Sequence, residues 1–397
     1  MANPPENYKG REQAYIKHYL LRNYFSRLIH KVAGAFQEFT YVDGFSGPWQ
    51  SSSDTFSDTS FGIALEEMRK AKQAWANHGH HIRMRALLVE KNAQAFAKLT
   101  EVPERYPDIE ITPLRGDFVT LVPALMNSLS FSTFTFLFID PKGWGINTSE
   151  IVPLLRRPNT EILFNFMFDF INRAISMNDS NIVSKVNNLI TTTSWRERLL
   201  SAPSEERRSI ILEAFAQTLR DVGGYSFVAE TPILRPSIDR HIYSLVYATR
   251  HRAGVKEFRD AQQKTIEEQE IVRDGVKMES RSGSQTELFS SAEMKPSAIA
   301  AFIEREAELA EQMLLALIGS SATDATAYGE IWPQVLSRRA ITHAELNKLV
   351  AKLRRSKTIL SDHWMPRQRV PTNASLLYRN PDMNVKTPAQ ENSSYTN

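Results

Sequence analysis

Apolar residues in the first 265 positions occur in short runs separated by stretches with helical periodicity. Residues 11–33 place aromatic and aliphatic side chains at helical spacing, which predicts an amphipathic helix packed on the segments after it. Five short apolar runs, rich in Val, Ile, Leu and Phe and without polar alternation, come next, at 39–43, 84–90, 109–114, 134–140 and 161–166. Such runs are typical of strands covered on both faces, and their alternation with helices predicts a parallel, doubly wound sheet. Two later runs, 227–234 and 241–251, lie close enough to form a hairpin. The expected fold is therefore α/β, with a parallel sheet that ends in an antiparallel pair.

Two segments interrupt this order. Residues 169–224 are helical by pattern and predict an insertion between the fifth strand and the hairpin. Residues 273–297 are polar, contain Gly and Ser and precede a helical stretch, which predicts a linker. We expect an α/β domain at 1–272 on the N-terminal side of that linker.

The chain beyond the linker has a different organisation. Two helical stretches precede a third that starts after Thr342, and Glu345 gives this start the spacing of a capping box. Two short strands come next, flanking a basic loop. This order is that of a winged helix-turn-helix, which we expect at 298–380, with a disordered tail at 381–397.

Composition limits the chemistry. The 397 residues include no cysteine, which excludes disulfides, zinc–thiolate sites, iron–sulfur clusters and cysteine nucleophiles. His241 and His251 flank the last predicted strand without a second ligand at a recognised spacing, and no metal site is predicted. No apolar run reaches the roughly 18 residues that a membrane helix needs, and the start lacks the apolar core of a secretory signal. We expect a cytoplasmic protein that does not contact a membrane.

Charge is unevenly distributed although the net charge is only +3. Between Ser337 and Asn380 there are ten Lys and Arg residues and two acidic ones, with Trp364 and Tyr378 among them. A basic segment on an acidic body predicts an anionic partner. We expect nucleic acid, and DNA rather than RNA, to contact Lys348, Lys352, Arg354, Arg355, Arg367 and Arg369. A solvated or protein-facing surface is the alternative.

An acidic residue stands at or just after each of the first four strands: Asp43, Glu90, Asp117 and Asp140. In an open parallel sheet the ligand crevice lies outside the carboxyl ends of the strands, so these four carboxylates are expected on one rim. There Glu90 would accept hydrogen bonds from both hydroxyls of a ribose, and Asp117 with Phe118 would contact an adenine. An ordinary turn or helix cap explains any one of these residues alone. The ordered set favours a nucleoside ligand.

Several segments together carry a family resemblance: YVDGFSGPW, TSFGIAL, LLVEKN, FIDPKGWG, EILFNF and YSLVYATRH. They resemble the three-Cys-motif partner (TcmP) proteins, which are similar to class I S-adenosylmethionine-dependent methyltransferases. The resemblance covers about residues 10–265, and the basic C-terminal part is similar to the winged-helix domain of many members. It implies a Rossmann-like methyltransferase sheet, S-adenosylmethionine as cofactor, and a partner protein of the radical-enzyme type with a three-cysteine motif.

The resemblance also implies roles for individual residues. The cofactor loop would comprise Asp43, Gly44, Phe45 and Gly47, with Glu90 at the ribose and Asp117 and Phe118 at the adenine. Asp140 and Pro141 stand where amino-methyltransferases of nucleic acids carry an (Asp/Asn)-Pro-Pro-aromatic motif, and Trp144 would supply the aromatic ring. The chain departs from the family at Trp49, where a glycine is usual, and it lacks the second proline of the motif.

The sequence leaves three functions open. The first is a methyltransferase directed to nucleic acid, in a bacterial mobile-element or anti-phage locus. The second is a catalytically inactive scaffold of the same fold that binds nucleic acid and a partner enzyme. The third is an enzyme acting on nucleotides or small molecules, with the basic unit used for assembly.

Overall fold

The computed structural model describes residues 8–47, 51, 56–141, 146–168, 171–172, 180–204, 206–238, 240–282 and 298–382. Its centre is a seven-stranded sheet with the order β3-β2-β1-β4-β5-β7-β6. Strands β1 to β5 are parallel, and β7 is antiparallel to both β5 and β6. The strands are β1 (Glu38–Asp43), β2 (Arg83–Glu90), β3 (Glu110–Arg115), β4 (Phe134–Ile139), β5 (Thr160–Phe166), β6 (Phe227–Leu234) and β7 (His241–Thr249). The predicted parallel sheet with its terminal antiparallel pair is confirmed.

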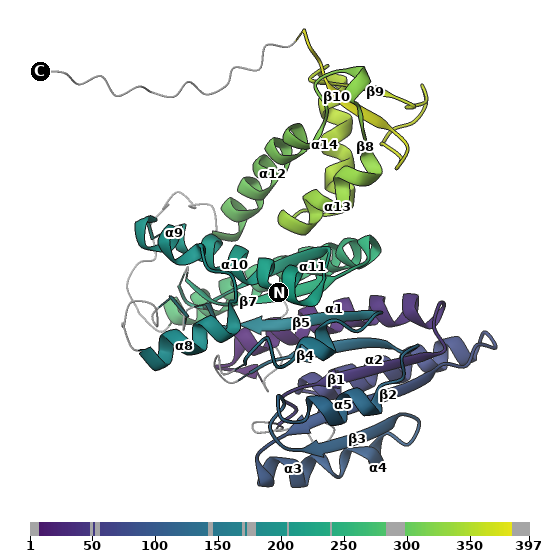
Figure 1. The fold of residues 1–397 in the computed structure, drawn as a ribbon, viewed down its shortest axis with the longest axis vertical. Coiled ribbons are helices and arrows are strands. Elements are labelled where there is room, and N and C mark those ends of the chain that lie inside the picture. The colour runs from purple at the N-terminus through teal and green to yellow at the C-terminus, as the bar shows by residue number, and fades with distance from the viewer. Residues whose placement is uncertain are drawn as a thin grey trace, which may run out of the picture.

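Helices cover both faces of the sheet (Figure 1). One face carries α1 (Glu12–Ala33), α2 (Ser60–Ala76) and α11 (Arg252–Ser282), which close over an aromatic core that includes Tyr24, Phe25 and Tyr247. The other face carries α5 (Val122–Ser128), α6 (Val152–Leu155), α8 (Ser180–Leu189), α9 (Trp195–Ser201) and α10 (Arg207–Gly223). The short helices α3 (Ala93–Leu99) and α4 (Val102–Arg105) precede β3. The predicted helix over residues 11–33 is α1, and its aromatic stripe is core packing.

Strand β3 differs from the prediction. Its residues are only half-buried, because β3 forms one edge of the sheet and has a neighbour on one side only. Pro113, which cannot donate a backbone hydrogen bond, is tolerated at such an edge. The interpretation that all five runs are covered on both faces is therefore wrong for residues 109–114.

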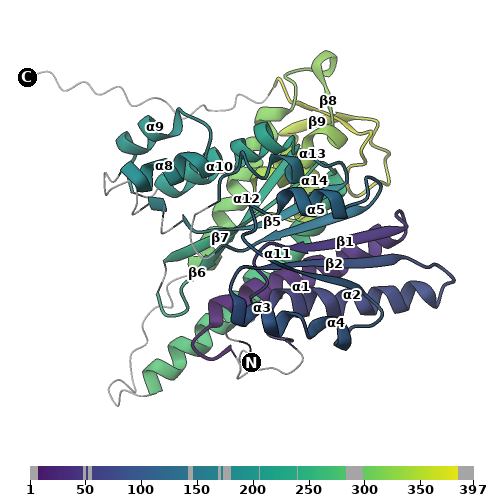
Figure 2. The same cartoon turned by 60° about the horizontal axis from the view of Figure 1, so that its bottom comes forward.

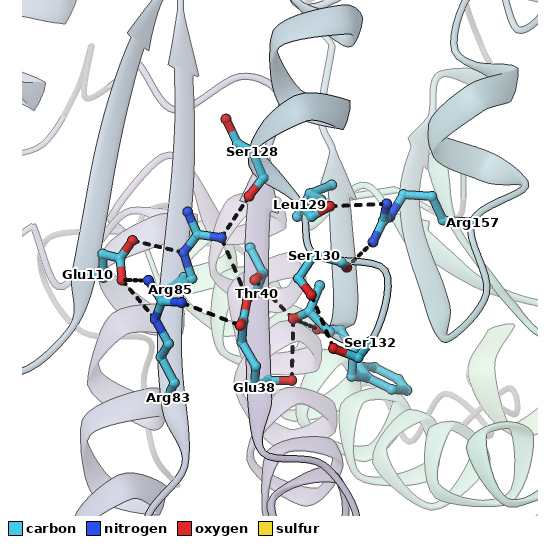
Figure 3. Close-up of polar contacts among 12 residues, drawn as sticks. Glu38, Thr40, Arg83, Arg85, Glu110, Ser128, Leu129, Ser130, Ser132 and Arg157 are labelled. Atoms are coloured by element: carbon cyan, nitrogen blue, oxygen red, sulfur yellow. Dashed lines mark hydrogen bonds and ion pairs between the residues drawn. The ribbon is translucent and has the colours of Figure 1, made fainter.

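Ion pairs hold the amino ends of the strands together, opposite the edge where the strands have their carboxyl ends (Figure 3). Arg85 of β2 donates from Nε to Glu110 Oε1 at 3.0 Å and from Nη1 to the Ser128 carbonyl at 2.7 Å. Arg83 contacts Glu110 at 2.5 Å, and buried Arg157 donates to the carbonyls of Leu129 and Ser130. These contacts join β2 to β3 and to the end of α5, and Arg157 to the loop before β4, so this edge of the sheet has a structural role.

A smaller unit begins after residue 297 and lies beyond α11, away from the first three strands (Figures 1 and 2). It contains α12 (Ala298–Leu317), η2 (Ala322–Asp324), α13 (Tyr328–Arg338) and α14 (His343–Arg355), with a three-stranded sheet in the order β8-β10-β9. The strands are β8 (Thr326–Ala327), β9 (Ile359–Asp362) and β10 (Leu376–Arg379). Thr342 and Glu345 form the predicted capping box at the start of α14.

The smaller unit shares an apolar core with α11 and the sheet, and one buried cation adds polar contacts to this packing. Arg259 of α11 donates from Nε to the Leu336 carbonyl of α13 at 2.6 Å and from Nη1 to the Glu230 carbonyl of β6 at 3.1 Å. Burial lowers the pKa of Arg259 to about 10. The buried guanidinium holds the two units together, because separating them would remove carbonyl acceptors from a buried charge.

The end of helix α11 differs from the predicted start of the linker. The helix continues to Ser282 and so occupies the first ten residues of the segment 273–297 that the composition indicated as linker. Residues 283–297 lie outside the described residues, as do 383–397 of the predicted tail and several residues of the predicted insertion. No helix of the described ranges is long and apolar enough to cross a membrane.

Candidate functional site

A cavity of about 500 Å³ opens at the carboxyl ends of β1, β2 and β4, where an open parallel sheet places its ligand crevice. Eight of the predicted cofactor and catalytic residues line it: Gly44, Phe45, Gly47, Glu90, Asp117, Phe118, Asp140 and Pro141. The start of α2 and the inner side of α1 complete the wall. Of the four carboxylates predicted on one rim, three line this cavity: Glu90, Asp117 and Asp140. Trp144, Pro48 and Trp49 lie outside the described residues.

One half of the cavity is acidic. Glu90 ends β2 and is 6% exposed, and its Oε1 accepts the backbone N–H of Asn92 at 2.6 Å. Asp117 lies in the loop after β3 with half of its side chain exposed, and its Oδ1 accepts the Val119 N–H at 3.1 Å. Each carboxylate uses one oxygen to order its own loop, and the Oδ2 of Asp117 also lies 3.8 Å from the Lys91 ammonium. The acceptor capacity that remains lies at the cavity wall.

Aromatic packing leaves little room for a side chain at Gly44. A Cβ at this position would stand 3.0 Å from the ring of Phe118. The same ring lies 5.7 Å, centroid to centroid, from that of Phe45. The two rings form an apolar wall between the loop after β1 and the loop after β3.

Three backbone donors of the loop after β1 are already used within the protein. The N–H of Gly44 donates to the Phe138 carbonyl at 3.0 Å, and that of Ser46 to the Val89 carbonyl at 2.8 Å. The N–H of Phe45 donates to Asp43 Oδ1 at 2.9 Å. These three donors are therefore not available to a ligand, because each already joins the loop to its own or a neighbouring strand.

Asp43 lies beneath the cavity and not at its surface. It is fully buried, and its Oδ2 accepts hydroxyl hydrogen bonds from Tyr41 at 2.9 Å and Ser60 at 2.8 Å. Burial raises the pKa of Asp43 to about 6, although the hydrogen bonds from Phe45, Ser60 and Tyr41 act in the opposite direction. Asp43 thus joins the end of β1 to the start of α2, and the structure gives it no direct contact with the cavity.

The first turn of α2 reaches the cavity through Thr59, Ser60 and Phe61. Thr59 caps the helix by accepting the Gly62 N–H at 3.1 Å. A Cβ on Gly62 would lie 2.0 Å from the Phe56 carbonyl oxygen, so only glycine allows this tight entry. The arrangement directs the positive end of the helix dipole at the cavity.

The other half of the cavity is centred on Asp140. Lys17 of α1 forms an ion pair with Asp140 Oδ2, and Asn165 at the end of β5 donates from Nδ2 to Asp140 Oδ1 at 2.5 Å. Both carboxylate oxygens therefore have partners before any ligand binds. Lys17 itself lines the cavity, and its side chain is only 14% exposed.

Helix α1 contributes further polar groups that the sequence did not indicate. His18 is buried at the cavity wall and shares a 2.9 Å hydrogen bond with the Tyr8 hydroxyl. Burial lowers the pKa of His18 well below its usual value, and the nearby Lys17 acts in the same direction. Arg11 also lines the cavity, with its guanidinium 3.5 Å from buried Asp58. The only sequence signal for Arg11, Lys17 and His18 as cavity residues is their spacing of one or two turns on an amphipathic helix.

The basic residues of the smaller unit divide into two groups. The exposed group contains Lys348, Lys352, Arg355, Arg367 and Arg369. Arg354 differs, since its guanidinium lies 4.6 Å from the ring centroid of Trp364. Trp364 is itself buried and donates its indole N–H to the Gln368 carbonyl at 2.8 Å. Trp364 therefore packs inside the smaller unit, although it lies among the cations in the sequence.

The strand order, the antiparallel last pair and the position of the cavity describe a Rossmann-like sheet. No protein-family model matches the chain, and no curated protein does. Among solved structures, protein LPL1258 of Legionella pneumophila is 10% identical over 59% of this chain and 85% of that chain, with a TM-score of 0.35.

Two further structures give similar values. An O-methyltransferase of Bacillus cereus in complex with SAH is 10% identical over 57% of this chain and 80% of that chain, with a TM-score of 0.31. SCL7 of Oryza sativa is 13% identical over 61% and 82%, with a TM-score of 0.34. Likenesses this weak support no argument, so the assignment of the fold depends on strand order and strand pairing.

Proposed function

We propose that the protein is an S-adenosylmethionine-dependent methyltransferase-like protein that acts on or with nucleic acid. One observation carries this proposal: a single cavity joins the acidic ends of β2 and β3 to the Lys17–Asp140–Asn165 cluster at the ends of β4 and β5. A group-transfer site on this sheet needs groups that bind a nucleoside on one side. It also needs polar groups near the reacting atoms on the other side.

The residues present fit the cofactor. Glu90 would accept hydrogen bonds from the ribose hydroxyls, and Asp117 with the Phe118 ring would hold the adenine. The start of α2 would face the carboxylate of the methionine tail, which the helix dipole favours. When bound, the cofactor supplies a methyl group on a positively charged sulfur. The cavity of about 500 Å³ lies within the usual range for such a ligand.

The acceptor side would orient the group to be methylated. Asp140, with Pro141 beside it, holds the end of β4, and its carboxylate is kept in place by Lys17 and Asn165. Such positioning accelerates a transfer by aligning the reacting atoms. Trp144 remains the predicted aromatic partner.

The smaller unit is proposed to be a winged helix. Support comes from the order β8, α13, α14, β9 and β10 with β10 between the other two strands. Helix α14 presents Lys348, Lys352 and Arg355 to solvent, and the loop after β9 adds Arg367 and Arg369. These cations would bind phosphates, with DNA preferred to RNA.

We also propose membership of the TcmP family, from the motifs of the N-terminal part. A three-cysteine-motif radical-enzyme-like partner and a role in an anti-phage locus follow from that proposal. Co-purification with such a protein encoded beside this one tests the partner. Recovery of the chain alone, from cells that produce both, would count against it.

The scaffold is the second candidate, and the site itself offers a reason for it. The loop donors of Gly44, Phe45 and Ser46 are satisfied within the protein, and Lys17 already pairs with Asp140. A core that no longer transfers methyl groups would tolerate this arrangement.

Calorimetric titration with S-adenosylmethionine and S-adenosylhomocysteine separates the two candidates. Glu90→Gln keeps an acceptor for Asn92 but removes the charge, so we expect the affinity to fall by about tenfold to a hundredfold, as for lost charge-assisted hydrogen bonds. Glu101→Gln, an exposed acid of the same lobe, is the matched control and should leave the affinity unchanged. If the wild type binds neither compound at millimolar concentration, the scaffold replaces the enzyme.

A further inference from the structure

Asn165 carries an unused acceptor inside the cavity. The residue ends β5, is 5% exposed and lines the cavity. Its Nδ2 donates to Asp140 Oδ1, whereas its Oδ1 has no hydrogen-bond partner within the described part of the chain. Buried carbonyl oxygens are normally paired, so an unpaired one at a ligand cavity indicates a partner that the ligand supplies.

The orientation of this amide follows from chemistry. An ionised carboxylate only accepts hydrogen bonds, so the atom of Asn165 that faces Asp140 must be the amide nitrogen. Lys17 holds the other carboxylate oxygen, which prevents the carboxylate from turning away. The amide oxygen of Asn165 is therefore directed away from Asp140.

The position of Asn165 separates it from the nucleoside half. The strand order places β1 and β4 between β2 and β5. Three strand spacings amount to about 14 Å between the strand that carries Glu90 and the strand that carries Asn165. A nucleoside held at Glu90 and Asp117 would reach β4 only with its tail, so Asn165 lies on the acceptor side.

A donor stands beside this acceptor. The Lys17 ammonium has three N–H groups, and Asp140 takes one of them. Lys17 and Asn165 both line the cavity and flank the same carboxylate. The Asn165 oxygen, an acceptor, and the Lys17 ammonium, a donor, therefore complement a ligand edge that has an N–H group beside a lone pair.

We propose that Asn165 Oδ1 accepts the N–H of an exocyclic amine on a nucleobase, while Lys17 donates to the adjacent ring nitrogen. The edges of adenine and cytosine have this arrangement, and flipped bases are bound through such edges. Asp140 is then a positioning residue that orients Asn165 and Lys17. This inference rests on the proposed function and names its substrate class.

Nucleosides test the contact without requiring turnover. The full chain is saturated with S-adenosylhomocysteine and titrated with cytidine, with adenosine, and with the analogues of both whose exocyclic amine carries two methyl groups. For the wild type we expect about a tenfold preference for the primary amine, the usual value of one hydrogen bond to a buried partner. Asn165→Ala should abolish this preference and leave the affinity for S-adenosylhomocysteine within about twofold.

Three further variants show whether the change in nucleoside preference is specific to the Asn165 amide. Asn127→Ala removes an exposed amide of α5 and should change neither affinity. Lys17→Met should weaken binding of both amine and dimethylamine forms, because it removes the donor to the ring nitrogen. Asn165→Ser serves as the second variant if the alanine variant has a lowered melting temperature.

Two results overturn the proposal: no preference in the wild type, or a preference that Asn165→Ala and Asn165→Ser retain. A wild type that does not bind S-adenosylhomocysteine refutes the proposed function instead. The cytidine pair, titrated into the free protein, then decides the Asn165 contact by itself.

Discussion

Asp43 gives the site a pH dependence that can be measured as stability. Its carboxylate is fully buried at the end of β1, and Tyr41, Phe45 and Ser60 donate its hydrogen bonds. Burial raises its pKa from 3.8 to about 6. Asp43→Asn keeps the shape of the side chain and removes the charge.

The sign follows from proton linkage. Because the folded pKa is above the unfolded one, the folded state binds this proton more tightly. Its contribution is fully present below the unfolded pKa and is lost as the pH rises through about 6. A shift of about two units corresponds to about 3 kcal/mol in total, of which about 1.4 kcal/mol is lost between about pH 5 and pH 8.

Urea denaturation followed by circular dichroism, near pH 5 and near pH 8, measures this difference. The wild type should lose about 1.4 kcal/mol more than Asp43→Asn between the two conditions. Asp221→Asn, an exposed acid of α10, is the control and should behave as the wild type. Equal pH dependence in the wild type and Asp43→Asn would refute the assignment of a buried, protonatable carboxylate to this position.

Three further changes probe other parts of the chain. Gly62→Ala places a Cβ 2.0 Å from the Phe56 carbonyl oxygen, so it should cost about 1–3 kcal/mol and weaken S-adenosylhomocysteine binding; unchanged thermal unfolding would contradict the tight entry to α2. Arg259→Met removes the donors to Leu336 and Glu230 and should raise hydrogen exchange in α13 while β1 to β4 stay protected; equal protection of α13 would show that the docking does not depend on this cation. Replacing Lys348, Lys352 and Arg367 together by Gln should flatten the salt dependence of duplex DNA binding by roughly two to three units of slope, whereas replacing the exposed Lys98, Lys185 and Lys264 should not. Binding that is equally salt-dependent in both triple variants would move the DNA contact elsewhere.

The sequence alone determined the sheet and its rim. Short apolar runs are a local property of the sequence, since a strand buried between helices needs apolar side chains on both faces. The predicted strands consequently agree with the seven observed ones to within two residues at each end. Parallel strands place their carboxyl ends at one edge, so Glu90, Asp117 and Asp140 could be assigned to one cavity without knowing any distance.

Tertiary structure decided what each rim residue contacts. Lys17 and Asp140 are 123 residues apart, and no local pattern brings them together, because the packing of α1 on the sheet decides which residues of its polar side face the cavity. Asp43 and Glu90 have the same position in sequence relative to their strands, yet one is buried beneath the loop and the other lines the cavity. Likewise Arg354 belongs to the same basic run as Lys352, but the Arg354 guanidinium packs over the Trp364 ring. The sequence shows which charged side chains are present. Which groups they contact depends on packing between residues far apart in the chain, which forms only in the folded protein.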